Sequence, residues 1–240
     1  MSDIAGNSGT ESIESAERLK RIKRRRIVLT PVRWLFGMLI FSLPALGPQN
    51  LYTKLPGMVF GALFFLQLLL ERSLQAPNVG GQKKDRASYF WGWLGYYATF
   101  AVSVIDWKWF PVGWKPWAWN MYWIWAGIGL FILGQGLRVI AIVTLGRFFT
   151  AHVRVHKDHK VIQHGIYAYL RHPSYTGMLL VALSYVTLFA SAYGYIAFFL
   201  FDLPGLLNRI RIEEKVLRKD LGRDYRDYCS RVKRLIPFVY

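Results

Sequence analysis

The residue types best suited to chemistry gather between residues 146 and 177. All five histidines of the chain lie in the stretch 152–172, and the run 171–177 reads Arg-His-Pro-Ser-Tyr-Thr-Gly. Proline is favoured in the first turn of a helix, so this run predicts a helix that starts near Pro173. The free N–H groups and the dipole of such a helix start can hold a carboxylate, although a capped helix with a cationic collar at a membrane surface would show the same pattern.

A second charged cluster follows in residues 208–222, which predict a helix that ends at Gly222. Arg209 and Glu213 are four residues apart, so they share a face of this helix. An amphipathic surface helix with an ion pair would give the same spacing. Because Arg209 directly follows an apolar stretch, its guanidinium can also reach an anion at a membrane interface.

The histidine spacing raises the question of a metal site. His152, His156 and His159 are spaced as on one helix face, but only Asp158 offers a carboxylate beside them. The single cysteine, Cys229, excludes thiolate-rich zinc or iron–sulfur sites. We therefore predict no metal site.

The elements that must position these residues are apolar helices. The chain is 53% hydrophobic with a formal net charge of +17, and its mean hydropathy is +0.21. A basic chain can bind nucleic acid, but here the basic residues avoid the long apolar runs, which favours a membrane protein without a nucleic-acid partner. We predict an all-α, polytopic transmembrane helical bundle of about six spans, with five crossings as the alternative. The spans are expected at 32–47, 55–71, 88–106, 120–146, 173–189 and 192–207, the last two forming a hairpin that turns near residues 191–194.

The distribution of charge predicts the orientation of these spans. Of the 31 Lys and Arg residues, 27 precede Trp34, lie in the segments 72–87 and 147–172, or follow Leu207. Cytosolic segments carry the excess of Lys and Arg in membrane proteins. Both termini are thus predicted to be cytosolic, in a bacterial inner membrane or the endoplasmic reticulum. Arg138 lies inside the fourth span, where an ionisable side chain either binds substrate or snorkels to the surface.

The motifs of the C-terminal hundred residues resemble a known family. The residues that carry this resemblance are the runs 159–162, 165–167 and 171–177, Arg209 with the Glu213–Glu214 pair, and the later Gly222, Tyr225, Tyr228 and Pro237. Together they are similar to the isoprenylcysteine carboxyl methyltransferase family and its bacterial and phospholipid-methyltransferase-like relatives, over residues 142–240. The chain then divides into a basic tail (1–31), an N-terminal transmembrane region (32–119) and a methyltransferase-like region (120–240).

The resemblance implies a cytosolic C-terminal site for S-adenosylmethionine. The residues that it assigns to the cofactor are His159, Lys160, Val161, Ile162, Tyr167, His172, Pro173, Ser174, Tyr175 and Glu213. Arg209 and Glu213 are the expected catalytic residues, and Arg209 and Arg138 the expected substrate contacts. The expected substrate is a lipid or a lipidated molecule from the bilayer.

The implied function is carboxyl O-methylation of an isoprenylcysteine-type acceptor. A carboxylate is already ionised at pH 7, so its methylation needs no general base. A phospholipid N-methyltransferase is the first alternative, and it would need a base such as Glu214 to take the proton of its amine acceptor. An NADPH-dependent enzyme like the sterol reductases is the second, since residues 225–240 also resemble the end of those proteins. A transporter or scaffold without enzymatic activity is the third.

Overall fold

The computed structural model describes residues 51–74, 87–109, 121–146, 149 and 161–236, which all belong to one compact unit, Gly47–Tyr240. Within these ranges the chain forms helices and turns with a single isolated β-bridge and no strand, so the all-α prediction is confirmed. The helices are α2 (Leu51–Leu74), α3 (Ala87–Trp109), α4 (Met121–Leu145), the 3₁₀-helix η4 (Gly165–Ala168), α5 (Pro173–Leu188), α6 (Ala192–Ala197), the π-helix η5 (Phe198–Asp202), α7 (Leu203–Asp220) and α8 (Gly222–Arg231).

Five of the six predicted spans fall on described helices, and the predicted span 32–47 lies outside the described residues. Helices α2 to α5 match the spans expected at 55–71, 88–106, 120–146 and 173–189 within a few residues. Among the described helices, Met121–Leu145 is long and apolar enough by itself to cross a membrane, whereas Leu55–Leu70 and Pro173–Leu188 are shorter apolar helices. The count of six spans therefore stays a prediction.

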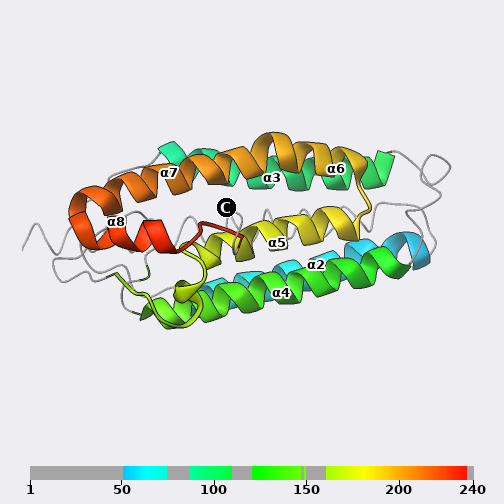
Figure 1. The fold of residues 1–240 in the computed structure, drawn as a ribbon. Helices are drawn as coiled ribbons and strands as arrows, with labels where there is room; N and C mark the ends of the chain where they lie inside the picture. The colour runs from blue at the N-terminus through cyan, green and yellow to red at the C-terminus, as the bar shows by residue number, and fades with distance from the viewer. Residues whose placement is uncertain (1–50, 75–86, 110–120, 147–148, 150–160, 237–240) are drawn as a thin grey trace, which may run out of the picture. The chain divides into compact units, whose positions relative to one another are not determined.

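The predicted hairpin is present, but its second arm is longer than expected. Ser191 caps α6 by accepting a hydrogen bond from the backbone N–H of Gly194 at 2.8 Å. From there α6, η5 and α7 follow one another without a break as far as Asp220. The apolar arm and the charged helix that the sequence separated are thus one helical rod, which Figure 1 shows running beside α3.

Helices α4 and α5 pack closely against each other because glycines remove side chains from their interface. A Cβ atom on Gly177 would lie 2.5 Å from the carbonyl oxygen of Gly134, and one on Gly127 would lie 3.0 Å from that of Ser184. Backbones that approach this closely are typical of helix pairs in membranes. The contact brings the middle of α4, with Arg138, against the first turns of α5.

Aromatic and amide side chains join α2, α3 and α5 at the centre of the bundle. Phe60 stacks on Phe100 with ring centroids 4.5 Å apart and meets Tyr185 edge-on at 4.9 Å. The hydroxyls of Tyr185 and Tyr96 both donate to the side-chain oxygen of Gln67, at 2.5 and 3.2 Å. These hydrogen bonds fix the three helices relative to one another.

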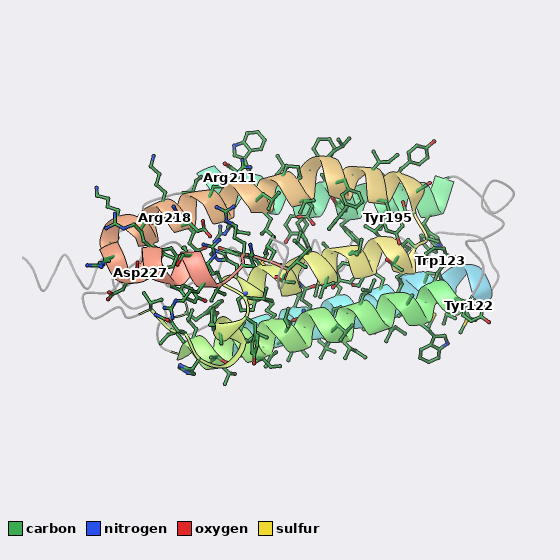
Figure 2. All side chains as sticks on the ribbon, in the orientation of Figure 1. Tyr122, Trp123, Tyr195, Arg211, Arg218 and Asp227 are labelled. Atoms are coloured by element: carbon green, nitrogen blue, oxygen red, sulfur yellow. The ribbon has the colours of Figure 1, made fainter. Side chains whose placement is uncertain are left out.

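The two ends of the bundle differ in composition. Figure 2 shows Arg218 and Asp227 at one end and Tyr122 and Trp123 at the other. Amphipathic rings are enriched where helices meet the lipid headgroups. The charged end carries α8 and the second half of α7, and it is the end at which the predicted site residues lie.

We predict that Gly177→Ala destabilises the fold, whereas Gly136→Ala on α4 does not. The new Cβ at residue 177 would meet backbone of α4, but a Cβ at residue 136 would have nothing within 4 Å. Overpacking of this kind costs about 1–3 kcal/mol. Thermal unfolding in detergent checks this, and equal melting temperatures for the two variants would contradict the packing role of Gly177.

Candidate functional site

The site is built where the start of α5, the middle of α7 and the residues after α8 meet. Residues 232–236, here called the C-terminal strap, lie across the start of α5 through a parallel bridge between Leu170 and Lys233. The backbone N–H of Arg171 donates to the carbonyl of Lys233 at 2.8 Å, and that of His172 to the carbonyl of Arg234 at 3.0 Å. The strap thus occupies N–H groups just before α5, so anion binding at this end depends more on side chains than the sequence suggested.

Tyr175 joins the two predicted catalytic residues. The Nε of Arg209 donates to the Tyr175 hydroxyl at 2.9 Å, and that hydroxyl donates to Oε2 of Glu213 at 2.5 Å. The guanidinium carbon also lies 5.8 Å from the centre of the Tyr175 ring. Arg209 is only 9% exposed. The structure therefore brings together Arg209, Glu213 and Tyr175 as one hydrogen-bonded unit, consistent with the shared helix face expected from their spacing.

Glu214, the next residue along α7, is the centre of a separate ionic cluster and is only 3% exposed. Arg234 from the strap contacts both of its carboxylate oxygens, with its Nη2 3.0 Å from Oε2 and its Nε 3.2 Å from each. The Nη2 of Arg171 and the Nε2 of His172 each lie 3.3 Å from Oε1. Arg218, half-exposed one turn further along α7, approaches Oε2 at 3.6 Å. One carboxylate thus holds the strap, α7 and the start of α5 together.

The partners of Glu214 keep it ionised. Burial by itself raises the pKa of this carboxyl, but the hydrogen bonds from His172 and Arg234 and the charge of Arg171 lower it from 4.5 to about 2. Glu214 therefore remains a carboxylate across the physiological range. It has no capacity to take up a proton near neutral pH.

Tyr167 and Tyr228 position the loop that leads into α5. The Tyr228 hydroxyl on α8 donates to the backbone carbonyl of Tyr167 at 2.7 Å. The Tyr167 hydroxyl in turn donates to the carbonyl of Ala141 on α4 at 3.3 Å. Burial raises the pKa of the Tyr167 phenol, and the nearby Glu213 carboxylate raises it further, so this hydroxyl stays neutral.

Arg138 and Ser174 meet on the side of α5 that faces α4. The Nη1 of Arg138 donates to the Ser174 hydroxyl at 3.2 Å. Ser174 and Tyr175 are consecutive residues of a helix, and their side chains diverge by about 100°. Arg138 and Arg209 therefore contact different faces of the first turn of α5. A role for Arg138 in substrate binding stays a prediction.

The structure covers the other predicted cofactor residues unevenly. His159 and Lys160 lie outside the described residues, as do His152 and His156. Val161 and Ile162 are half-buried and non-helical, and Pro173 is buried in the first turn of α5. Within the described ranges, no group of three or more His, Cys, Asp or Glu residues is placed to hold a metal ion.

Sequence reasoning missed most of the ionic cluster. Arg234 was not predicted, and Arg171 was predicted only as part of the motif 171–177, although both are within 3.3 Å of Glu214. Thr176 belongs to the same motif, but its contact was not predicted: its hydroxyl donates to the carbonyl of Leu235 in the strap at 2.9 Å. The only available signal was the adjacent Glu213–Glu214 pair, since consecutive carboxylates on a helix must point in different directions.

Comparison with known proteins confirms the family resemblance. Residues 127–219 match the model of the isoprenylcysteine carboxyl methyltransferase (ICMT) family. The chain is 36% identical over 122 residues to a probable protein-S-isoprenylcysteine O-methyltransferase of rice. The aligned region covers 49% of this chain and 64% of that protein. The chain is also 36% identical over 115 residues to protein-S-isoprenylcysteine O-methyltransferase B of Arabidopsis thaliana, covering 47% of this chain and 58% of that protein. The match thus spans less than two thirds of these relatives' own length.

The fold also has a solved counterpart. The structure of the eukaryotic intramembrane Ras methyltransferase ICMT, determined without a monobody, superimposes with a TM-score of 0.57 and 23% sequence identity. The superposition covers 85% of this chain and 73% of that one. The likeness therefore extends beyond the segment that the sequence motifs mark, to the helices that precede it.

We predict that Glu214→Gln destabilises the protein by about 3 kcal/mol, because the variant leaves the buried guanidinium of Arg171 without its carboxylate. Asp227→Asn is the control, since its ion pair with Arg223 is exposed and such pairs contribute about 0–1 kcal/mol.

The lowered pKa of Glu214 also determines how this difference in stability depends on pH. The advantage of the wild type over Glu214→Gln is complete above about pH 4.5 and is lost as the pH falls towards 2.

Denaturant unfolding in detergent at pH 7 and at pH 3 measures both effects. A wild-type advantage that stays constant between these pH values would contradict the ionic role of Glu214. So would equal stabilities of Glu214→Gln and the wild type at pH 7.

Proposed function

We propose that this chain is an S-adenosylmethionine-dependent methyltransferase of the membrane surface, and that it methylates the carboxylate of an isoprenylcysteine-type acceptor. The observation that carries the proposal is the unit of Arg209, Tyr175 and Glu213 at the end of a helical bundle. The match of residues 127–219 to the isoprenylcysteine carboxyl methyltransferase family supports it. So do the names of the relatives in rice and Arabidopsis.

The side chains at the charged end suit the cofactor. S-adenosylmethionine supplies an electrophilic methyl group on a sulfonium, together with a carboxylate and an adenosine. The buried Nε of Arg171 has no hydrogen-bond partner among the described residues, so this side chain retains a donor for a carboxylate. The neutral Tyr167 and Tyr175 offer ring faces to a cation or an adenine, and Glu213 suits a cation or a ribose hydroxyl.

Arg209 would orient the acceptor. Tyr175 engages its Nε, and the aromatic ring beside it restricts the plane of the guanidinium. A guanidinium held in this way suits the two oxygens of a carboxylate. Because the acceptor is ionised at neutral pH, the residues have only to align it with the methyl group and exclude water.

The chemistry of Glu214 argues against an amine acceptor. Methylation of a phospholipid amine needs a base that removes a proton, and Glu214 is the residue that the sequence predicts for this role. The cations around it lower its pKa to about 2, so it does not take up a proton at neutral pH. Carboxyl methylation makes no such demand on the site.

The solved counterpart and the apolar helix α4 both support a location in a membrane. The solved counterpart is described as an intramembrane enzyme, and α4 is long and apolar enough to cross a bilayer. We propose that the charged end faces the cytosol, where the water-soluble cofactor is available. The bundle would then present the acceptor, a lipid or lipidated molecule, from the bilayer side.

The test of the reaction uses cofactor labelled in its methyl group. Purified protein in lipid vesicles is incubated with N-acetyl-S-farnesylcysteine, and the lipid extract is treated with alkali. A methyl ester releases its label as volatile methanol, whereas an N-methyl group retains it. No volatile label would overturn carboxyl methylation, and label retained in phospholipid would favour the amine acceptor.

We predict that His172→Ala weakens binding of S-adenosylhomocysteine by about tenfold, because it removes one of the side chains assigned to the cofactor and a partner of Glu214. Arg209→Ala should bind the same ligand normally and lose methyl transfer by about a hundredfold. Arg211→Ala is the matched control, since Arg211 is exposed on α7 and should change neither quantity. Calorimetry and a single-turnover assay separate the two effects, and equal losses of ligand binding in His172→Ala and Arg209→Ala would contradict the assigned roles.

A further inference from the structure

Leu235 is a buried apolar residue of the C-terminal strap to which the proposed mechanism gives no role. It is 4% exposed, and of the five strap residues it alone is buried. Its side chain forms a hydrophobic cluster with Leu206 and Ile210 of α7. Its backbone carbonyl accepts a hydrogen bond from the hydroxyl of Thr176 on α5 at 2.9 Å. Leu235 therefore lies between the helix that carries Arg209 and the first turn of α5.

The strap holds one face of α7, and the predicted catalytic residues lie on the face next to it. The α7 residues that the strap contacts are Leu206 and Ile210, through Leu235, and Glu214, through the adjacent strap arginine at 3.0 Å. Successive members of this set are four residues apart, so they form one stripe along the helix. Arg209 and Glu213 form the neighbouring stripe. A shift or rotation of α7 against the strap would therefore move the catalytic residues with it.

The strap is attached to α5 in a similar way. The backbone N–H of His172 donates to a strap carbonyl at 3.0 Å, and the hydroxyl of Thr176 donates to the next one. These two residues are four apart on the helix start, and Tyr175 lies on the stripe beside them. On both helices the strap thus occupies the stripe adjacent to the side chains that meet in the candidate site.

The contact between Arg209 and Tyr175 is sensitive to the separation of α5 and α7. The Nε of Arg209 donates to the Tyr175 hydroxyl at 2.9 Å. A hydrogen bond is lost when its donor and acceptor move to about 3.6 Å, so a displacement of less than about 1 Å would break this one. A misplacement of about 1 Å in a group that orients a substrate can cost about a hundredfold in rate. The packing that holds the two helices at this distance is therefore important for the reaction.

Building on the proposed function, we propose that Leu235 is a positioning residue for Arg209. Its side chain packs between α5 and α7 and holds α7 at the separation and rotation at which the Arg209 Nε meets Tyr175. The guanidinium is thereby held in the plane that the carboxylate of the acceptor requires. Leu235 acts through Tyr175 and Arg209, and does not bind the acceptor itself.

Kinetics with N-acetyl-S-farnesylcysteine in lipid vesicles test this proposal. Leu235→Ala keeps the backbone of the strap and removes only the side chain that packs on α7. We expect its kcat/KM for the acceptor, at saturating cofactor, to fall by about tenfold or more. Binding of S-adenosylhomocysteine should stay unchanged. Leu235→Val, a smaller truncation, should give an intermediate loss, and Leu235→Met, which conserves the volume, should recover most of the activity.

Leu188→Ala is the matched control for loss of packing. Leu188 is 2% exposed and is the last residue of α5, at the opposite end of the helix from the strap. Its truncation should lower the melting temperature as Leu235→Ala does, but it should leave kcat/KM for the acceptor at the wild-type value. Equal losses of kcat/KM in the two alanine variants would show that Leu235 has only a structural role, and an unchanged kcat/KM in Leu235→Ala would show that it has no positioning role.

A double-mutant cycle with Tyr175→Phe tests whether Leu235 acts through this contact. Tyr175→Phe keeps the ring and removes the hydroxyl that meets Arg209. In that background, Leu235→Ala should reduce kcat/KM by less than about twofold, because the contact that it disturbs is already absent. A tenfold loss that persists in the Tyr175→Phe background would overturn this inference. If the wild type does not methylate the acceptor, the proposed function fails and this inference fails with it, whereas the other outcomes bear on this inference alone.

Discussion

The charged end of the bundle depends on the contacts that the buried Glu214 carboxylate makes with the cationic and hydrogen-bonding side chains around it. Its partners Arg171 and His172 precede α5, and Arg234 belongs to the strap near the end of the chain. These segments are far apart in sequence, and each brings positive charge or a hydrogen-bond donor to one point. Separating them would leave buried charge without a partner, which is much costlier than breaking an exposed ion pair. The loop before α5 and the strap are therefore held in place together.

Most of the fold could be predicted because the signal for a membrane helix is long and local. Runs of apolar residues located α2 to α5 within a few residues, and Ser191 marked the hairpin turn. The sequence reasoning divided the last arm into a span and a separate amphipathic helix, because the composition changes from apolar to charged after Leu207. The change in composition indicates where the helix leaves the apolar environment, but it does not indicate a break in the helix. The backbone of α6, η5 and α7 continues through that change as one rod.

The site was predictable in part, for a related reason. Arg209 and Glu213 are four residues apart on one helix, so their shared face could be read directly from the sequence. Tyr175 was expected in the pocket, but its position between these two residues depends on how α5 packs against α7. The partners of Glu214 are separated from it by 20 residues for Arg234 and 42 for His172, and no local pattern encodes such contacts.

The rotation of α7 about its axis determines which glutamate contacts Tyr175 and which enters the ionic cluster. Glu213 and Glu214 are neighbours, and their side chains diverge by about 100°, so one reaches Tyr175 while the other enters the ionic cluster. A rotation of α7 by one residue would move each glutamate out of its present environment. Upstream, η5 makes one wider turn that changes the phase of all the residues after it. The π-turn that ends at Asp202 thus sets the rotation of α7 relative to α3 and α5, and with it the faces that carry Arg209, Glu213 and Glu214.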